Sequence, residues 1–387
     1  MPPHISMRRA KTLVSSILVC SSLLLLPACS HIQVTGTHAE SIAIRSVAER
    51  NVGGAVAPDP AGLRLAVASD GLLVTDLSTG AGQRLAADSP SQLGWSPSGR
   101  ILAAAFPAGE RTRLRLFDPS GSLVSETWIA GSVTGLFVLS DNEVVATGTR
   151  FETFSFGTSW QECLYRWRIG EEPVRQIMHE TTLKPQTART YGADNLSRTM
   201  RPVLSPIGDE LLYGKILDPP VFAPSLRIVI RNLRQNSEKE IGSVGLDAGV
   251  PVFANNGEDV IFGDSAGQAR RRAAWSGEEL ATLPVPGRRL AISRTGRHIV
   301  IDGHLYRDDR EIAAFPPESE AAFLPDGRLL LTWEDGVYLA EGIEQIPAAP
   351  PLDPERAGQL RDIRAWRAGG LITAAEYIAA RERILHP

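Results

Sequence analysis

Pairs of short apolar runs, each pair joined by a small polar turn, recur along most of the chain. The turn carries Gly or Asn in seven copies, at Gly62, Gly99, Asn142, Gly208, Gly257, Gly296 and Gly327. Residues 96–99 and 205–208 are Ser-Pro-x-Gly, in which proline fixes φ and glycine accepts a positive φ. We therefore predict a tight hairpin between two strands at every one of these turns.

The spacing of the turns predicts a repeat architecture. Successive turn residues lie about 44 residues apart on average, the length of one four-stranded blade of a β-propeller. Two more apolar runs follow the hairpin, for example at residues 114–118 and 123–128. We predict an all-β fold, a seven-bladed β-propeller over residues 42–346. Residues 41–47 are expected to complete the last blade and close the ring, which removes exposed sheet edges.

A short motif supports this architecture. Residues 116–121, Leu-Phe-Asp-Pro-Ser-Gly, resemble the strand end and turn of WD-repeat-like propellers. Over residues 42–349 the turn pattern and period are similar to this superfamily, which includes the Tol-Pal-type periplasmic propellers. The resemblance implies an architecture and brings no functional residue with it.

The C-terminal segment has a helical pattern instead. After a proline-rich linker at residues 347–353, Asp353 and Pro354 begin a helix with Leu360, Ile363 and Trp366 on one face. A capping box at residues 373–376 begins a second helix.

Residues 360–385 resemble the bacterial short C-terminal helical domain called SHOCT, and that resemblance implies association or docking without catalysis. A hairpin of this length buries too little apolar surface alone. We therefore expect residues 354–387 to dock on the propeller, on a second copy of the chain or on another protein.

The N-terminal pattern predicts that the chain is targeted to a membrane. Three basic residues precede an apolar run over residues 12–26, which ends in Pro27, Ala28 and Cys29. The run is shorter than the roughly 20 residues of a transmembrane helix, although an uncleaved signal anchor is an alternative.

Residues 23–29 resemble the lipobox of bacterial lipoproteins. The resemblance implies a signal peptide at residues 1–28, lipid groups such as palmitate on Cys29, and a flexible tether at residues 29–41. Because Ser30 stands where inner-membrane retention usually needs Asp, it also implies an outer-membrane location, with the domain facing the periplasm.

The net charge and the cysteine content limit the kinds of binding partner that we expect. The net charge is −4 and the pI is about 6, so we expect no nucleic acid partner. The basic run at residues 270–272 is interpreted as the solvated face of a strand, with an anion-binding patch as the alternative. Cys163 is predicted to be a buried strand residue or, failing that, an intermolecular hook.

The longest interval in the repeat indicates a candidate binding surface. Asn142 and Gly208 are 66 residues apart, with the excess at residues 151–160 and 179–201, and a third insertion lies at residues 217–224. These loops emerge on one face of a propeller. The predicted ligand- or partner-binding residues are Phe151, Phe154, Phe156, Trp160, Arg189, Tyr191, Arg198, Arg201 and Phe222. Aromatic and arginine side chains are enriched at binding hot spots, although the aromatics could instead pack their own loops.

Catalytic and metal chemistry have weak support in the sequence. Residues 263–267, Gly-Asp-Ser-Ala-Gly, match the Gly-x-Ser-x-Gly motif and resemble the serine motif of α/β-hydrolases. The motif falls where the fifth unit needs a hairpin. His298 and His304 lie too close in sequence to follow a late Asp of a triad, and His386 is in the tail. His179, His298 and His304 share no ligand spacing, so we expect neither a metal nor a cofactor.

We predict a non-enzymatic envelope lipoprotein, a protein-binding or scaffold module that uses its loop-bearing face and its helical hairpin. Self-association through the hairpin is one option. A serine hydrolase using Ser265 is the alternative function.

Overall fold

The computed structural model describes residues 32–154, 157–191, 201–206, 208–218, 223–246, 249–254, 257–263, 268–283, 289–293, 295–308, 310–344, 354–368 and 370–385. Residues 33–387 form one compact unit, separate from Met1–Ile32. The predicted signal peptide and Cys29 lie outside the described residues.

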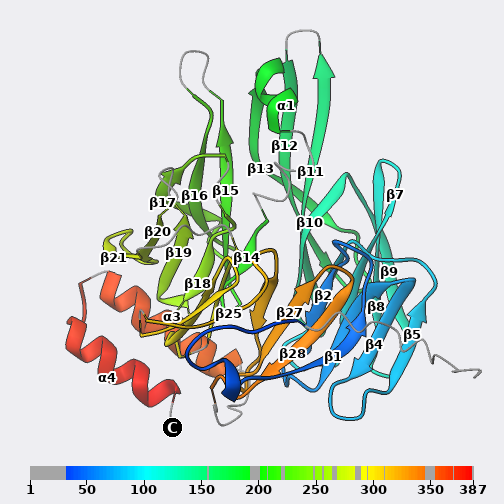
Figure 1. The fold of residues 1–387 in the computed structure, drawn as a ribbon. Helices are drawn as coiled ribbons and strands as arrows, with labels where there is room; N and C mark the ends of the chain where they lie inside the picture. Colours follow the sequence, from blue (N-terminus) through cyan, green and yellow to red (C-terminus); the bar gives the residue numbers. More distant parts are fainter. Residues whose placement is uncertain are drawn as a thin grey trace, which may run out of the picture. The chain divides into compact units, whose positions relative to one another are not determined.

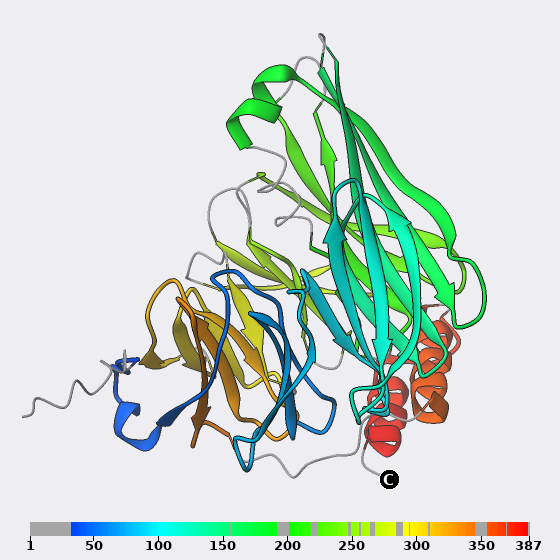
Figure 2. The same ribbon diagram turned by 90° about the vertical axis from the view of Figure 1, so that its right-hand side faces the viewer.

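Seven four-stranded antiparallel sheets make up the described part of the chain, as predicted for a seven-bladed β-propeller (Figures 1 and 2). In six blades the strands follow one another across the sheet in chain order. The first strands of successive blades lie beside each other, β2 with β6, β6 with β10, β18 with β22 and β22 with β26. They therefore surround the axis of the ring.

The first four blades are built from consecutive strands. Blade one contains β2 (Val56–Pro58), β3 (Arg64–Ser69), β4 (Gly71–Asp76) and β5 (Gly82–Ala86). Blade two contains β6 (Gln92–Trp95), β7 (Leu102–Ala108), β8 (Arg111–Phe117) and β9 (Leu123–Ala130). Blade three contains β10 (Ser132–Ser140), β11 (Glu143–Phe154), β12 (Gly157–Arg168) and β13 (Val174–Leu183). Blade four contains β14 (Val203–Leu204), β15 (Glu210–Leu217), β16 (Ser225–Asn232) and β17 (Ser237–Val244).

The remaining three blades include the one that closes the ring. Blade five contains β18 (Val252–Ala254), β19 (Asp259–Gly263), β20 (Ala269–Ala273) and β21 (Glu279–Leu283). Blade six contains β22 (Leu290–Ile292), β23 (His298–Ile301), β24 (His304–Arg307) and β25 (Arg310–Ala314). Blade seven contains β26 (Glu320–Phe323), β27 (Leu329–Trp333), β28 (Gly336–Glu341) and, from the start of the chain, β1 (Ala43–Glu49).

The predicted turns join the first and second strands of each blade. In blade two, Gly99 has a φ of +69° and its N–H donates to the carbonyl of Ser96 at 2.8 Å. The Ser96 hydroxyl accepts the N–H of Ile101 at 3.0 Å, which fixes the start of the next strand. The Ser-Pro-x-Gly sequence therefore forms the tight hairpin that its residues predict.

The ring closes as expected, through β1. This strand pairs antiparallel with β28, from Ala43 opposite Glu341 to Glu49 opposite Gly336. The structured chain begins earlier than predicted, because the N–H of Thr35 donates to the carbonyl of Ala314 at 3.0 Å and the N–H of Ala314 donates back at 2.8 Å. The prediction of a flexible tether up to residue 41 therefore does not hold for residue 35, which is bound to blade six.

Apolar side chains between neighbouring blades form the core. One cluster joins Leu116 of blade two to Val144 and Trp167 of blade three. Cys163 in β12 belongs to the same cluster and is fully buried, which confirms its prediction as a buried strand residue.

Blade three is extended beyond the expected length. Residues 151–160 were predicted as a loop, but residues 151–154 belong to β11 and residues 157–160 to β12, paired with Phe151 opposite Trp160. Figure 1 shows these strands rising beside the short helix α1 (Pro185–Tyr191). The insertion is rich in aromatic residues and threonine, types that favour paired strands.

The described helices also include η1 (Ala39–Ser41), α3 (Pro354–Ala368) and α4 (Ala374–Leu385). Leu360 and Ile363 of α3 are buried against Tyr377 of α4, while Trp366, expected on the same face, is 48% exposed. The predicted capping box is present, since the Thr373 N–H donates to Glu376 Oε2 at 2.7 Å. None of the helices in the described ranges is long and apolar enough to cross a membrane.

Candidate functional site

The antiparallel order of the strands gives the ring two distinct faces. The turns between second and third strands emerge on the same face as the connections from one blade to the next, and we call this the loop face. The turns between first and second strands, and between third and fourth, emerge on the opposite side, which we call the turn face. The extended end of β11 therefore belongs to the loop face.

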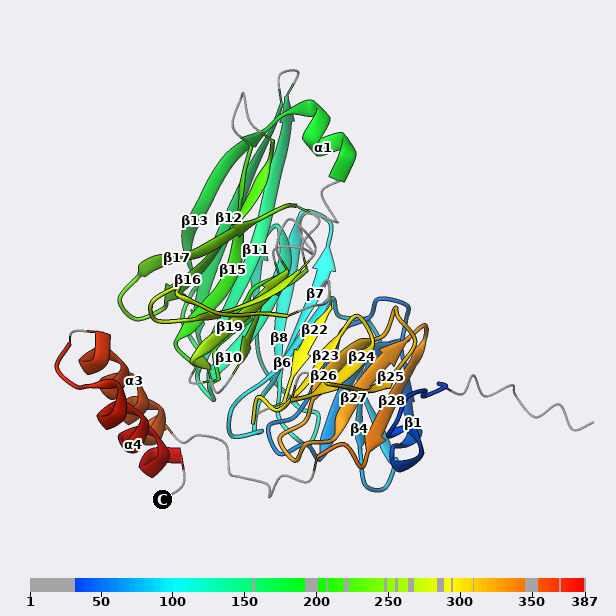
Figure 3. The ribbon, with the colours of Figure 1, turned by 60° about the vertical axis from the view of Figure 1, so that its left-hand side comes forward.

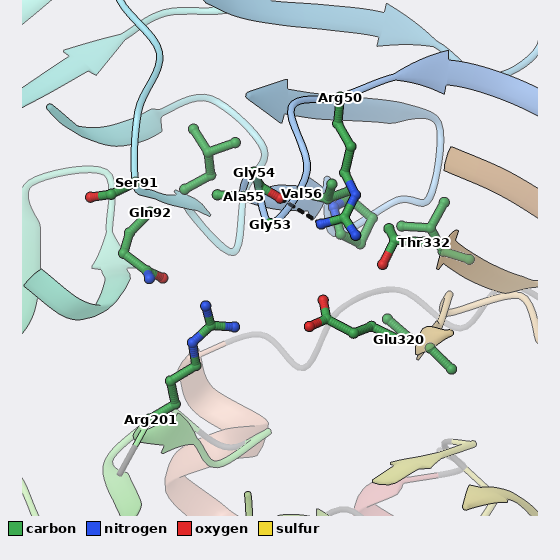
Figure 4. A pocket seen from close by; sticks show the side chains of 15 residues that line it. Arg50, Gly53, Gly54, Ala55, Val56, Ser91, Gln92, Arg201, Glu320 and Thr332 are labelled. Atoms are coloured by element: carbon green, nitrogen blue, oxygen red, sulfur yellow. Dashed lines mark hydrogen bonds between the residues drawn. The ribbon is translucent and has the colours of Figure 1, made fainter. Parts of the chain in front are cut away.

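A cavity of about 160 Å³ opens where the blade-to-blade connections meet the first strands. Its polar lining comes from blades one, two, four and seven (Figure 4). These polar residues are Arg50, Ser91, Gln92, Arg201, Glu320 and Thr332. Because blade seven meets blade one through ring closure, the fold gathers residues from both ends of the propeller around one opening.

Three charged side chains dominate the cavity. Arg50 lies in the connection from β1 to β2, Arg201 lies just before β14, and Glu320 is the first residue of β26. Figure 4 shows the Arg201 and Glu320 side chains pointing into the cavity from opposite sides. Arg50 Nη1 donates to the Gly54 carbonyl at 2.9 Å, which orients the guanidinium.

The electrostatics of the cavity favour a ligand that carries negative charge and hydrogen-bond acceptors. Burial lowers the pKa of Arg50, the charge of Arg201 lowers it further, and Glu320 opposes both. Two guanidinium groups therefore face a single carboxylate, so the lining carries an excess of positive charge and of hydrogen-bond donors.

The predicted binding residues differ in location and in exposure. Arg201 lines the cavity, while Phe151 and Phe154 are 52% and 44% exposed on β11. Trp160, a predicted binding residue, is fully buried in a cluster with Leu183 and with Ile216 of blade four, which favours the alternative that the aromatics pack within the fold. The ring of Phe151 stacks on it with centroids 6.2 Å apart. Trp160 thus supports the exposed Phe151 from within the core.

The other predicted binding residues lie in or beside the insertions. Arg189 is exposed on α1, where its Nε donates to the Pro185 carbonyl at 3.1 Å, and Tyr191 is the last residue of that helix. Phe156, Arg198 and Phe222 lie outside the described residues. The prediction therefore included Arg201 and missed Arg50 and Glu320. The double glycine beside Arg50, Gly53-Gly54, is the signal in the sequence that marks this connection.

The serine motif lies between two antiparallel strands. Gly263 ends β19 and Ala269 begins β20, and these two residues pair with each other. Ser265 itself lies outside the described residues. In α/β-hydrolases the same motif connects a strand to a helix, so the surroundings here differ from a nucleophile elbow.

The histidines and the basic run have local partners. His298 Nδ1 lies 2.9 Å from Glu344 Oε2, and His304 Nδ1 lies 3.0 Å from Glu311 Oε1. No group of three or more potential metal ligands occurs in the ranges that the structure covers. Arg270 and Arg272 pair with Glu279, and Arg271 pairs with Asp259, so all three arginines lie partly exposed on β20 with carboxylate partners.

The helical hairpin docks on the turn face. Arg364 donates to Glu210 of blade four and to Glu258 of blade five, both at 2.9 Å, and Arg361 lies 3.4 Å from Asp209. The Arg367 guanidinium lies 4.5 Å from the ring centroid of Trp275. Figure 3 shows α3 and α4 at the end of the blades opposite α1. Of the three docking partners considered from the sequence, the propeller is the one present here.

Comparison with known proteins identifies the fold. No protein-family model matches the chain, and no curated protein matches it. Among solved structures, the β-propeller domain of Cps50 (Swd1) from Myceliophteria thermophila is similar, with a TM-score of 0.52 and 15% identity over 76% of this chain and 98% of that one. Hydrazine synthase from Kuenenia stuttgartiensis is similar with a TM-score of 0.52 and 13% identity, over 78% of this chain and 98% of that one. Likeness at this level of identity shows the fold alone, and the chain is a seven-bladed β-propeller followed by C-terminal helices.

Proposed function

We propose that this chain is a non-enzymatic, lipid-anchored protein of the bacterial envelope that binds a protein partner through its loop face. In this proposal the anchor is the lipid on Cys29, the membrane is the outer membrane, and the propeller works in the periplasm. The propeller fold is compatible with such a scaffold role, because propellers carry binding loops on a rigid ring.

One observation carries the binding proposal. Arg50, Arg201 and Glu320 come from three distant parts of the chain and line one open cavity on the loop face. The exposed Phe151 and Phe154 stand on the same face. Exposed aromatic side chains beside charged groups are typical of protein-binding surfaces.

The hairpin supports the choice of face. Because α3 is held by Glu210 and Glu258, the hairpin covers part of the turn face and leaves the loop face to a partner. Self-association through the docked hairpin would use its outward side, where Trp366, Leu371 and Ile378 are exposed.

The short tether supports a location close to the membrane. Thr35, which is already hydrogen-bonded to blade six, lies six positions after Cys29. Six extended residues span about 20 Å at most. A lipid on Cys29 would therefore hold the rim of blade six near the bilayer surface.

Photocrosslinking in cells tests the proposal. A photoreactive residue at Phe151, at the loop-face end of β11, should capture a discrete partner. The matched control is a photoreactive residue at Asn142, which is exposed at the turn-face end of the same strand. Equal capture at both positions, or no capture at Phe151, contradicts the proposed face.

The enzyme alternative has its own test. A serine-reactive fluorophosphonate should leave the protein unlabelled under the scaffold proposal. Labelling that disappears in Ser265→Ala would favour a hydrolase instead.

A further inference from the structure

We infer that the cavity lined by Arg50, Arg201 and Glu320 binds a carboxylate group that has an N–H donor beside it, as in an acidic residue of a peptide. This inference deepens the proposed function, on which it rests, by naming the chemistry of the partner.

The two arginines are available for a ligand. Neither forms an ion pair with any residue that the structure describes, and Arg50 Nε is buried without a hydrogen-bond partner among those residues. Arginines on the strands behave differently, since Arg271 and Arg115, for example, each pair with a carboxylate. Guanidinium groups present forks of N–H donors that match the two oxygens of a carboxylate.

Thr332 is an independent sign of a ligand. This residue of β27 lines the same cavity, is only 6% exposed, and its Oγ1 has no hydrogen-bond partner within the described residues. Buried hydroxyl groups in native proteins almost always have a partner. A polar ligand in the cavity would supply one.

The charge of the lining selects the class of anion. Two guanidinium groups and one carboxylate leave an excess of one positive charge, which matches a monoanion. A phosphate with two negative charges would be repelled by Glu320. The same carboxylate would instead accept an ammonium or amide N–H adjacent to the bound carboxylate.

The size of the cavity agrees with this class. A volume of about 160 Å³ exceeds the roughly 30 Å³ share of one water molecule several times over. It therefore accommodates the end of an acidic side chain together with its neighbouring peptide group.

Binding of two short peptides tests the inference on the full mature protein in detergent. The probes are fluorescein-labelled Gly-Gly-Gly-Asp amide and its Gly-Gly-Gly-Asn counterpart, which differ by one carboxylate, and affinity is measured by fluorescence anisotropy. The aspartate peptide should bind at least about tenfold more tightly. Arg201→Gln should remove this preference, and Arg201→Lys should retain part of it. Glu320→Gln keeps an acceptor oxygen for the adjacent N–H and removes the charge that repels the bound carboxylate, so it should tighten binding of the aspartate peptide.

Controls separate the cavity from general surface charge. Arg84→Gln, an exposed change on β5 outside the cavity lining, should leave both affinities unchanged. Displacement of the aspartate peptide by N-acetylglycine, a monoanion with an N–H beside its carboxylate, would extend the site to small free carboxylates, and resistance to N-acetylglycine would restrict it to peptides. Equal binding of the two peptides, no binding of either, no effect of Arg201→Gln, or stronger displacement by inorganic phosphate than by N-acetylglycine would overturn the inference.

Failure here is distinguishable from failure of the proposed function. Capture of a partner at Phe151 together with no preference for the aspartate peptide would remove the carboxylate site and leave the scaffold role. A preference for the aspartate peptide without capture at Phe151 would keep the carboxylate site and contradict the proposed partner on the loop face.

Discussion

The guanidinium of Arg364 in α3 lies 2.9 Å from the carboxylate of Glu258 in blade five. The same guanidinium lies 2.9 Å from Glu210 in blade four and donates to the carbonyl of Gly257 at 3.1 Å. One largely buried side chain therefore ties the C-terminal hairpin to two blades. Burial raises the pKa of Glu210 and Arg364 opposes that rise, so the carboxylate depends on its cationic partner.

Replacing Arg364 should release the hairpin. Arg364→Met leaves Glu210 and Glu258 in place without their cation, a change that costs about 3–5 kcal/mol for a buried ion pair. Hydrogen exchange of the α3 and α4 amides should accelerate. Arg383→Met, a change at an exposed position of α4, should leave exchange as it is. Adding Glu210→Gln and Glu258→Gln to Arg364→Met should restore part of the protection, and unchanged exchange in Arg364→Met would refute the role of this contact.

The closure of the ring predicts a sensitive glycine. Gly342 follows β28 with a φ of +88°, and a Cβ there would lie 2.2 Å from the carbonyl oxygen of Ser41. Gly170 has a φ of +87° with nothing within 4 Å, so Gly170→Ala should cost only the roughly 1–2 kcal/mol of the left-handed conformation. Gly342→Ala should cost about 1–3 kcal/mol more because of the clash. Chemical denaturation measures both, and equal losses would show that the contact with Ser41 is unimportant.

Glu162 should make stability depend on pH. This side chain of β12 is buried, and one of its oxygens has no hydrogen-bond partner among the described residues. Burial raises its pKa to about 8, although Lys215 opposes the shift. The pKa of Glu162 is higher in the folded than in the unfolded state. Its contribution to the free energy of unfolding is therefore greatest below pH 4.5 and falls as the pH rises to 8.

The test compares variants across that range. Between pH 5 and pH 8 the free energy of unfolding of the wild type should fall by on the order of 4 kcal/mol relative to that of Glu162→Gln. Glu180→Gln, at an exposed position of β13, should follow the wild type. Parallel pH profiles for the wild type and Glu162→Gln would mean that Glu162 keeps its ordinary pKa.

The lipid anchor predicts a single labelled residue. Cys29→Ser should abolish incorporation of labelled palmitate and move the protein from the membrane fraction to the soluble periplasm, because several acyl chains supply the membrane affinity. Cys163→Ala should keep the label, since that thiol is buried in β12. Membrane attachment of Cys29→Ser would favour an uncleaved signal anchor.

The repeat made the fold predictable from local residues. Each turn, such as that at Gly99, carries its own conformational signal, and the mean spacing of the turns matches one blade. Pairing of β1 with β28 follows from the ring, because a closed propeller needs one blade shared by both ends of the chain. The boundary of α3 at Pro354 also follows from a local capping signal.

The candidate site was only partly predictable. Arg50 and Glu320 are 270 positions apart, and only ring closure brings them together, so no local pattern pairs them. Trp160 and Phe151 share one insertion, yet one is buried and the other exposed, because blade four covers only part of the extended sheet. The binding surface was predicted from long insertions, mainly in blade three, whereas the cavity lies largely among short connections between blades.

Hydrogen exchange on the complex with its copurified partner tests the central claim most directly. The claim predicts that the partner protects the loop face, at residues 50–58, 91–93, 151–160 and 201–204, and leaves exchange on the turn face and in α3 unchanged. Protection confined to the turn face and the hairpin, or a mature protein that copurifies with no partner at all, would contradict it.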